Sequence, residues 1–445
     1  MTSQRLRKIF SGIYILLACL AVRLFYIQIY KGLDYSELAE KQFVKKIKKE
    51  SLRGEVFDRN GRCLATSLES QSVFIRPKEV DRPGELVRLL QTSLSLDPRD
   101  LRQKLGSGRD FFWLERKLSP LQARMIEEKK LRGLGVQSEQ KRYYPDGSLA
   151  CHIVGSVGMD NHGLSGIEQA LDSFLTGKML VVDQLRDGKG RSLLTDVRSS
   201  SALAGGAESS KSNSVALTID RSLQYVAERE IQRGVEENRA KSGMILIQNP
   251  KTGEILAMAA YPNFDPNELS KGALPKRFDM ARIQNPMVGR VFEPGSTFKI
   301  VAFSAALEEK TFSTNDVLHC ENGKWKFLDV TINDHEPSAD LTLPQVMERS
   351  SNIGTAKIGL KLGKDVFFRY ARAFGFGNKT GLLLPGESEG LLKDPKEWSK
   401  VSLPILAFGQ GLGVTAVQMI GAFSAIANGG ILMEPMILKR DVMAE

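Results

Sequence analysis

The sequence predicts an α+β protein of several domains, held at a membrane by an N-terminal helix. Three observations support this class. The 445 residues exceed what one hydrophobic core usually organises, so two or three domains are expected. Residues 9–30 are almost entirely apolar. Further along, strand-like alternation and helical spacing follow one another, and this mixture predicts helices packed on mixed sheets.

The composition favours a mostly soluble, folded protein. Hydrophobic residues make up 42% of the chain and charged residues 26%, which argues against long disorder and against many membrane spans. The net charge of +10 suits an anionic partner. Because the basic residues are spread along the chain, a solvated surface is the favoured interpretation and no nucleic-acid function is predicted.

Cysteine and histidine residues are too scattered to predict a metal site. Neither the cysteines nor the histidines show the spacing of a zinc cluster or a disulfide framework. They are Cys19, Cys63, Cys151, Cys320, His152, His162, His319 and His335. We therefore expect no structural or catalytic metal.

The apolar stretch from Ile9 to Tyr30, with Arg23 as its one charge, is long enough to cross about 30 Å of hydrocarbon as a helix. Basic residues precede it at Arg5, Arg7 and Lys8, and they favour a cytoplasmic N-terminus. Four lysines between residues 45 and 49 weaken that charge asymmetry. A cleaved signal peptide, a buried core helix and an interfacial helix are the alternatives to an uncleaved anchor.

After the anchor, residues 51–65 predict two strands joined at Asn60-Gly61, a pair suited to a tight hairpin. Residues 80–140, including a helical pattern from Leu121 to Lys130, predict a small α+β unit. Ile167, Leu171 and Leu175 recur every four residues and predict a short helix over 166–175.

Residues 199–214 are rich in Ser, Gly and Ala, the composition of a flexible connection. We place the main domain boundary there, near Ser212. Beyond it the pattern predicts a strand over 214–219 and a helix over 221–238. Residues 243–259 predict two strands joined between Asn249-Pro250 and Gly253.

The strongest chemical signal is Glu293-Pro-Gly-Ser-Thr-Phe-Lys299, followed by an apolar helical stretch over 300–307. Pro294 and Gly295 predict that a helix starts near the serine. Ser296 and Lys299 would then share one helical face, where a neutral lysine amine can take the hydroxyl proton. Free N–H groups at the helix start can stabilise an oxyanion. Ser-x-x-Lys alone is a weak signal, because chance spacing of two common residues is frequent and an ordinary surface helix start explains the pattern in most proteins.

A second polar cluster follows at Ser350-Ser351-Asn352. It offers another hydroxyl for proton relay and an amide that can hold a peptide carbonyl. The alternative is that Ser350 or Ser351 simply caps a helix.

With these two motifs and further segments along the sequence, the chain resembles the class B penicillin-binding proteins of the division-specific, septal kind. The resemblance spans nearly the whole length. The segments that carry it are Arg53–Gly61, Gly163–Glu168, Leu217–Asp220, Asn249–Ala257, Glu293–Lys299, Ser350–Gly354 and Phe408–Thr415.

The resemblance implies a peptidoglycan D,D-transpeptidase. Ser296 would be the acylated nucleophile, Lys299 its general base, Ser350 a proton relay and Asn352 a ligand of the donor peptide. The donor would be a stem peptide ending in D-Ala-D-Ala, and β-lactams would acylate Ser296 as its mimics. Partners would include a membrane glycosyltransferase and other division proteins.

The resemblance also implies the fold and the place in the cell. We expect a cytoplasmic tail over 1–8, an anchor over 9–30, a non-catalytic pedestal over 31–211 and a penicillin-binding, β-lactamase-like transpeptidase domain over 212–445. The anchor would lie in the bacterial inner membrane, with the catalytic domain outside the cytoplasm.

The family's third motif, Lys-Thr/Ser-Gly on a strand after the second motif, is not found in that context. Candidates begin at Lys241, Lys251 and Lys379. The first two precede Ser296, and the third follows a glycine-rich loop. We therefore expect the transpeptidase domain as given to be C-terminally incomplete. A non-catalytic membrane scaffold of the division machinery, truncated or degenerate, is the competing hypothesis, and a penicillin sensor or β-lactamase-like hydrolase is a third.

Overall fold

The computed structural model describes residues 2–36, 44–50, 52–176, 179–185, 213–270 and 279–439. The chain divides into two compact units. One comprises Met1–Ser51 with Gly177–Ser212, and the other comprises Leu52–Thr176 with Asn213–Glu445. The predicted flexible connection, up to residue 212, lies outside the described residues.

The first unit holds the apolar helix and a two-stranded sheet. α1 (Thr2–Phe25) continues into a π-helical turn, η1 (Tyr26–Tyr30). Within the described residues, Ile9–Tyr30 is the one segment long and apolar enough to cross a membrane, and none of its side chains is buried, as contact with lipid would require. β1 (Val44–Glu50) pairs antiparallel with β6 (Met179–Leu185).

The second unit begins with the predicted hairpin. β2 (Val56–Phe57) pairs antiparallel with β3 (Cys63–Ile75). Asn60-Gly61 forms the turn, with Gly61 at a φ of +79°, a region that glycine enters without steric cost. β3 also pairs with β4 (Phe112–Leu118) and along its length with β5 (Leu134–Tyr143), while β2 pairs in parallel with β7 (Val215–Ala216). The predicted strand over 214–219 is therefore shorter than expected.

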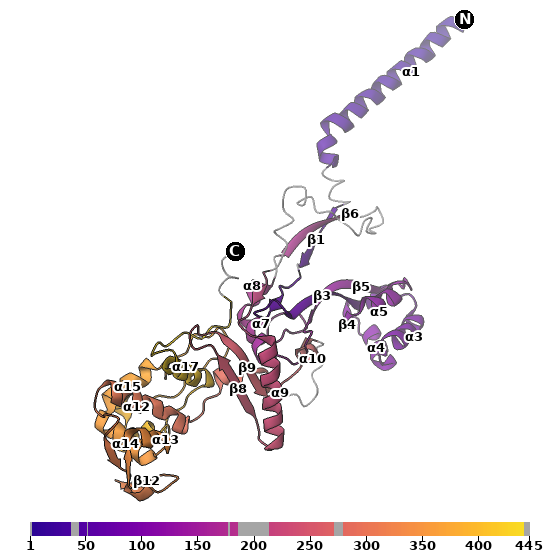
Figure 1. Ribbon diagram of the computed structural model, residues 1–445. Coiled ribbons are helices and arrows are strands. Elements are labelled where there is room, and N and C mark those ends of the chain that lie inside the picture. The colour runs from indigo at the N-terminus through magenta and orange to yellow at the C-terminus, as the bar shows by residue number, and fades with distance from the viewer. Residues whose placement is uncertain are drawn as a thin grey trace. The chain divides into compact units, whose positions relative to one another are not determined.

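Three helices pack on β3, β4 and β5 to form the predicted small α+β unit (Figure 1). They are α3 (Pro83–Leu94), α4 (Pro98–Gly106) and α5 (Pro120–Glu127). Each begins with proline, whose fixed φ suits the first helical position. Val73 and Ile75 of β3 are fully buried against Leu86 and Leu90 of α3. Burying each such side chain contributes about 1.5–3 kcal/mol relative to exposing it.

The predicted helix over 166–175 is broken in two. α7 (Gly166–Ala170) ends at Leu171, which has non-helical φ and ψ, and α8 (Asp172–Leu175) follows. The break directs the Asp172 carboxylate to the Gly163 amide, 2.9 Å away, and to Arg53 Nη1, 2.6 Å away. The predicted apolar positions are confirmed at Ile167 and Leu175, both fully buried. The short helix α6 (Cys151–Val154) packs on α7.

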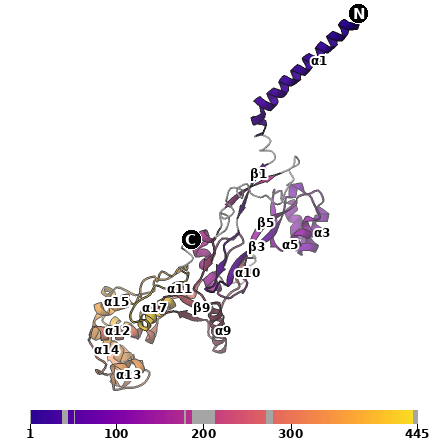
Figure 2. The ribbon, with the colours of Figure 1, turned by 45° about the horizontal axis from the view of Figure 1, so that its top comes forward.

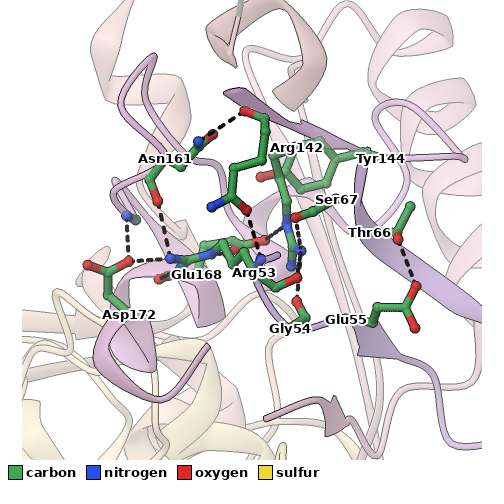
Figure 3. Close-up of polar contacts among 12 residues, drawn as sticks. Arg53, Gly54, Glu55, Thr66, Ser67, Arg142, Tyr144, Asn161, Glu168 and Asp172 are labelled. Atoms are coloured by element: carbon green, nitrogen blue, oxygen red, sulfur yellow. Dashed lines mark hydrogen bonds and ion pairs between the residues drawn. The ribbon is translucent and has the colours of Figure 1, made fainter. Parts of the chain in front are cut away.

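A buried charge network ties this region together (Figure 3). Arg53 Nε and Arg142 Nε each donate to one oxygen of Glu168, both at 2.6 Å. Arg53 also donates to Asp172 Oδ1, and Arg142 donates to the carbonyl of Gly54 at 2.7 Å. Two segments of the family resemblance, those containing Arg53 and Glu168, thus meet in space.

Next along the chain, α9 (Arg221–Glu237) lies beside the β8–β9 hairpin (Figure 1). β8 (Gly243–Gln248) and β9 (Ile255–Tyr261) are antiparallel, as predicted. Gln224 of α9 exchanges two hydrogen bonds with the backbone of Met258, at 2.7 and 3.0 Å. α10 (Pro266–Ser270) follows β9.

The end of the described chain returns to this hairpin. Glu254 forms a parallel bridge with Met436, and Leu217 forms an antiparallel bridge with Leu438. Residues 436–438 therefore lie between the β9 edge and the segment that follows β7. Backbone hydrogen bonds of residues 436–439 thus join the sheet that contains β7 to the β8–β9 hairpin.

The remaining elements form a mainly helical region, in which α12, α13, α14 and α15 group together (Figure 2). The elements that follow residue 279 are η4 (Met280–Ile283), α11 (Pro286–Gly289), η5 (Gly295–Phe298), α12 (Lys299–Glu308), β10 (Val317–His319), η6 (Glu321–Gly323), β11 (Lys324–Phe327), β12 (Val330–Asn333), β13 (Asp340–Thr342), α13 (Leu343–Glu348), α14 (Asn352–Leu362), α15 (Lys364–Ala373), η7 (Pro395–Glu397), α16 (Ser402–Ala407) and α17 (Ala416–Ala427). The 3₁₀ turn η2 (Pro77–Glu79) belongs to the small α+β unit, where it packs on α4. β10 pairs with β13, and β11 with β12.

α12 is the centre of this region. Val301, Ala302 and Ala305 are fully buried, and α14, α15 and α16 pack around the helix. A helix that is apolar on nearly every side belongs in a core. Because α12 is packed in this way, Lys299 at its N-terminal end is held in a rigid setting.

Candidate active site

Ser296 lies on a tight turn that leads into the central helix. The turn is η5, a 3₁₀ turn rather than a regular α-helix start, and Lys299 is the first residue of α12. Thr297 Oγ1 donates to the Pro294 carbonyl at 2.7 Å. Phe298 is fully buried while Ser296 is exposed. The predicted helix start near the serine is therefore confirmed, with a tighter first turn.

Lys299, three residues after Ser296, is buried, with 1% of its surface exposed. Its Nζ donates to the Ser350 carbonyl at 2.5 Å and to Ser350 Oγ at 3.0 Å. Within the described residues, both hydrogen bonds of this amine go to Ser350 and neither goes to Ser296, the partner that the i, i+3 spacing led us to expect. The reason is tertiary, because α14 packs on α12 and brings Ser350 to the amine.

Burial lowers the pKa of Lys299 from 10.5 to about 8, although the Asp334 carboxylate opposes this shift. Moving an ammonium out of water disfavours its charged form, whereas a nearby carboxylate favours it. About a tenth of such amines are neutral at pH 7. A neutral amine beside exposed hydroxyls can accept a proton.

Ser350 occupies the turn between α13 and α14. It is exposed and has a φ of +53°, a region that non-glycine residues seldom adopt. In this conformation both its carbonyl and its hydroxyl reach Lys299. The neighbouring Ser351 caps α14 by accepting from the Gly354 amide at 2.9 Å, so the alternative of a helix cap applies to Ser351 and not to Ser350.

Asn352 begins α14 and is partly exposed. Its Nδ2 donates to the Asn333 carbonyl at 2.9 Å, which leaves the amide oxygen without a hydrogen bond from the described residues. Sequence reasoning missed Asp334, which accepts from the amides of Asn352 and Ile353 at 2.5 and 2.9 Å. The signal that could have indicated it is an acidic residue directly after a strand.

The glycine-rich segment 408–415 lies against the Ser296 turn. The Gly295 amide donates to the Gly409 carbonyl at 2.9 Å. The Gly411 amide donates to Glu293 Oε1 at 2.9 Å, and Phe292 bridges Val414. Residues 292–295 and 408–415, which the sequence separates by more than a hundred residues, therefore lie against each other next to Ser296.

The three Lys-Thr/Ser-Gly candidates lie elsewhere. Lys251-Thr252-Gly253 is the turn between β8 and β9, where the Gly253 amide donates to the Asn249 carbonyl. Thr380, of the candidate at Lys379, bonds Glu387 through its amide and hydroxyl. Ser242 accepts from Arg290 at 2.9 Å. In the described part of the chain, none of these side chains bonds Lys299 or Ser350.

An exposed serine, one turn before a buried amine that contacts a second serine, is an arrangement that enzymes using a covalent serine intermediate employ. In the described residues no group of three or more His, Cys, Asp or Glu could hold a metal ion.

Two family models match the chain. Residues 243–443 match the penicillin binding protein transpeptidase domain, and residues 48–206 match the penicillin-binding protein dimerisation domain. The chain is 32% identical over 402 residues to the peptidoglycan D,D-transpeptidase FtsI of Escherichia coli, covering 87% of this chain and 65% of FtsI. It is 33% identical over 451 residues to the probable peptidoglycan D,D-transpeptidase PbpC of Pseudomonas aeruginosa, covering 99% of this chain and 77% of PbpC.

A solved structure has the same fold. Penicillin-binding protein 3 of Mycobacterium tuberculosis, in complex with aztreonam, superposes with a TM-score of 0.61 at 28% identity, covering 88% of this chain and 68% of that one. The chain belongs to the class B penicillin-binding proteins. It spans less than two thirds of the length of FtsI.

Proposed function

We propose that the chain provides the membrane-anchored serine centre of a peptidoglycan D,D-transpeptidase that cross-links stem peptides during septal wall synthesis. The observation that carries the proposal is the contact of the buried Lys299 amine with Ser350, one turn from the exposed Ser296. The relatives named as D,D-transpeptidases support it.

In the proposed acylation, Ser296 Oγ attacks the carbonyl carbon of the penultimate D-Ala while neutral Lys299 accepts the hydroxyl proton. The C–O bond forms and the amide C–N bond breaks. Ser350, within hydrogen-bonding distance of Lys299, passes a proton to the departing nitrogen, and the terminal D-Ala leaves as an amine. Asn352 would hold the peptide through its amide.

In the second half-reaction, an amine of a neighbouring stem peptide attacks the ester carbonyl. The new amide bond forms, the bond to Ser296 Oγ breaks, and the serine recovers its proton through Lys299. A β-lactam would enter the same first step, since its strained amide carbonyl stands where the D-Ala carbonyl would. The steps require no cofactor.

The test is covalent labelling. The full chain, produced in membranes, is exposed to a fluorescent penicillin beside a Ser296→Ala variant. Ser304→Ala, a serine two turns further along α12, is the matched control. We expect a labelled band near 49.3 kDa from the unaltered chain and the control, and none from Ser296→Ala. No label on any of the three would contradict the proposed function and would favour the scaffold hypothesis.

We also propose that Ile9–Tyr30 anchors the chain in the inner membrane with its N-terminus in the cytoplasm, and that it works beside a membrane glycosyltransferase and other division proteins. Arg5, Arg7 and Lys8 before the span support this orientation. A reporter enzyme active only outside the cytoplasm, fused after Lys439, should be active. If that reporter is inactive and a reporter that works only in the cytoplasm is active at the same position, the proposed orientation is wrong.

A further inference from the structure

Asp334 lies directly after β12 and uses both of its carboxylate oxygens on the start of α14. Oδ1 accepts from the amides of Asn352 and Ile353, at 2.5 and 2.9 Å. Oδ2 accepts from the Ser351 hydroxyl at 2.6 Å. A carboxylate that receives amide donors at a helix start makes hydrogen bonds stronger than neutral ones.

These contacts set the direction of the turn that carries Ser350. The Ser351 hydroxyl has one proton, which it donates to Asp334, so its lone pairs remain for the Gly354 amide at 2.9 Å. Asn333 accepts from the Asn352 side chain. Residues 333–334 therefore hold residues 351–353 at four points, immediately beside the strained Ser350 backbone.

The Asp334 carboxylate also raises the pKa of Lys299, against the effect of burial. Charged side chains on the other elements packed on α12 contact groups other than Lys299 or are exposed. Lys361 of α14 lies over the Phe312 ring, and Lys364 and Asp365 of α15 are exposed. On α14, Lys357 pairs with Glu321. On α15, Arg369 pairs with Glu309 and Arg372 donates to the Gly377 carbonyl. α16 carries no charged residue.

We propose that Asp334 is a positioning residue for the acylation of Ser296: it locks the turn at Ser350–Asn352 against Lys299 and keeps a negative charge near that amine. The proposal rests on the proposed function. Asp334 touches no reacting atom. It acts through its hydrogen bonds to Ser351 and to the start of α14, and through the electrostatic effect of its charge on the Lys299 amine.

Two substitutions separate its two roles. Asp334→Asn keeps an oxygen for the amides of Asn352 and Ile353, and its new NH₂ group can donate to Ser351 Oγ, so the geometry is retained while the charge is lost. Asp334→Ala removes both. Asp340→Asn is the control, because Asp340 is an exposed carboxylate of the same region that pairs with His319.

The measurement is the rate of acylation of the full chain by a fluorescent penicillin as a function of pH. Removing a negative charge disfavours the ammonium, so Asp334→Asn should move the half-maximal pH downward from its value in the unaltered chain, with little change in the plateau rate. Asp334→Ala should show the same displacement and lose roughly tenfold in the plateau. Asp340→Asn should match the unaltered chain.

A second measurement does not depend on acylation. Brief labelling with acetic anhydride across pH, with mass spectrometry of the peptide that contains Lys299, reports the protonation of that amine. If the unaltered chain is acylated and Asp334→Asn leaves both pH profiles unchanged, the role of Asp334 is refuted and the proposed function stands. If no variant is acylated, the proposed function fails, and the labelling midpoint of Lys299 alone decides whether Asp334 acts on the amine.

Discussion

At the residue scale, the chemistry depends on where one amine is held. Lys299 is buried, and its contacts go to Ser350 through packing between helices. Burial lowers the pKa of this lysine to about 8, which makes it a base suited to neutral solution. The same side chain on an exposed helix face would remain protonated.

This pKa predicts two pH dependences. Acylation should rise as pH passes through about 8, because the neutral amine is the reactive form. Stability should also rise with pH from about 8 towards 10.5, because in this window the unfolded chain binds more protons than the folded one. Lys299→Met should lower the acylation rate by about 10²–10⁴-fold and remove that part of the stability profile.

Acylation kinetics with a fluorescent penicillin and urea titrations at several pH values check both expectations. Lys396→Met is the control, since Lys396 is exposed and should change neither. Acylation by Lys299→Met at the rate of the unaltered chain would exclude this lysine as the base.

At the scale of elements, the serine turn depends on its contact with the glycine-rich segment. Gly409 has a φ of +83°, and a Cβ there would lie 2.0 Å from the Gly295 carbonyl oxygen. No side chain fits that distance, so the turn that carries Ser296 and the loop at Gly409 can approach only through glycine.

Gly409→Ala should therefore displace the turn and lower both stability and acylation. Gly429→Ala is the matched control, because Gly429 also has a positive φ, +90°, but a Cβ there would meet nothing within 4 Å. Both variants carry the backbone strain of about 1–2 kcal/mol. Only Gly409→Ala should lose acylation, measured at equal amounts of folded protein. Equal acylation by the two variants would contradict the proposed importance of this contact.

At the scale of the whole molecule, the buried network of Arg53, Arg142 and Glu168 joins segments far apart in the sequence (Figure 3). All three side chains are almost completely buried. The Glu168 carboxylate balances two guanidinium groups that water cannot reach, so its loss leaves buried charge without a partner.

Glu168→Gln should consequently destabilise the second unit by about 3–5 kcal/mol, measured as a lower urea midpoint and as faster amide exchange around β3 and β5. Asp172→Asn removes another partner of Arg53, but Asp172 is partly exposed and water can replace its contact. A smaller effect is expected there. If both variants unfold at the same urea concentration, the burial of Glu168 does not explain how the network stabilises the second unit.

Much of the architecture follows from local patterns. The hairpin at Asn60-Gly61, helix α9 and the β8–β9 pair occur where spacing and turn residues predicted them. The apolar segment over 9–30 was equally evident. The break at Leu171 was not, because it accompanies a contact between Asp172 and Arg53, and hydrophobic spacing carries no information on that contact.

The sequence by itself determined the candidate serine and lysine, the helix start that presents them and the family that the chain resembles. Only the tertiary structure decided which group Lys299 contacts and that Ser351, not Ser350, caps α14. It also decided that Asp334 supports the turn at Ser350–Asn352. The physical reason is range. Turn and helix preferences act over a few neighbouring residues, whereas burial and contacts between distant segments exist only once the chain has packed.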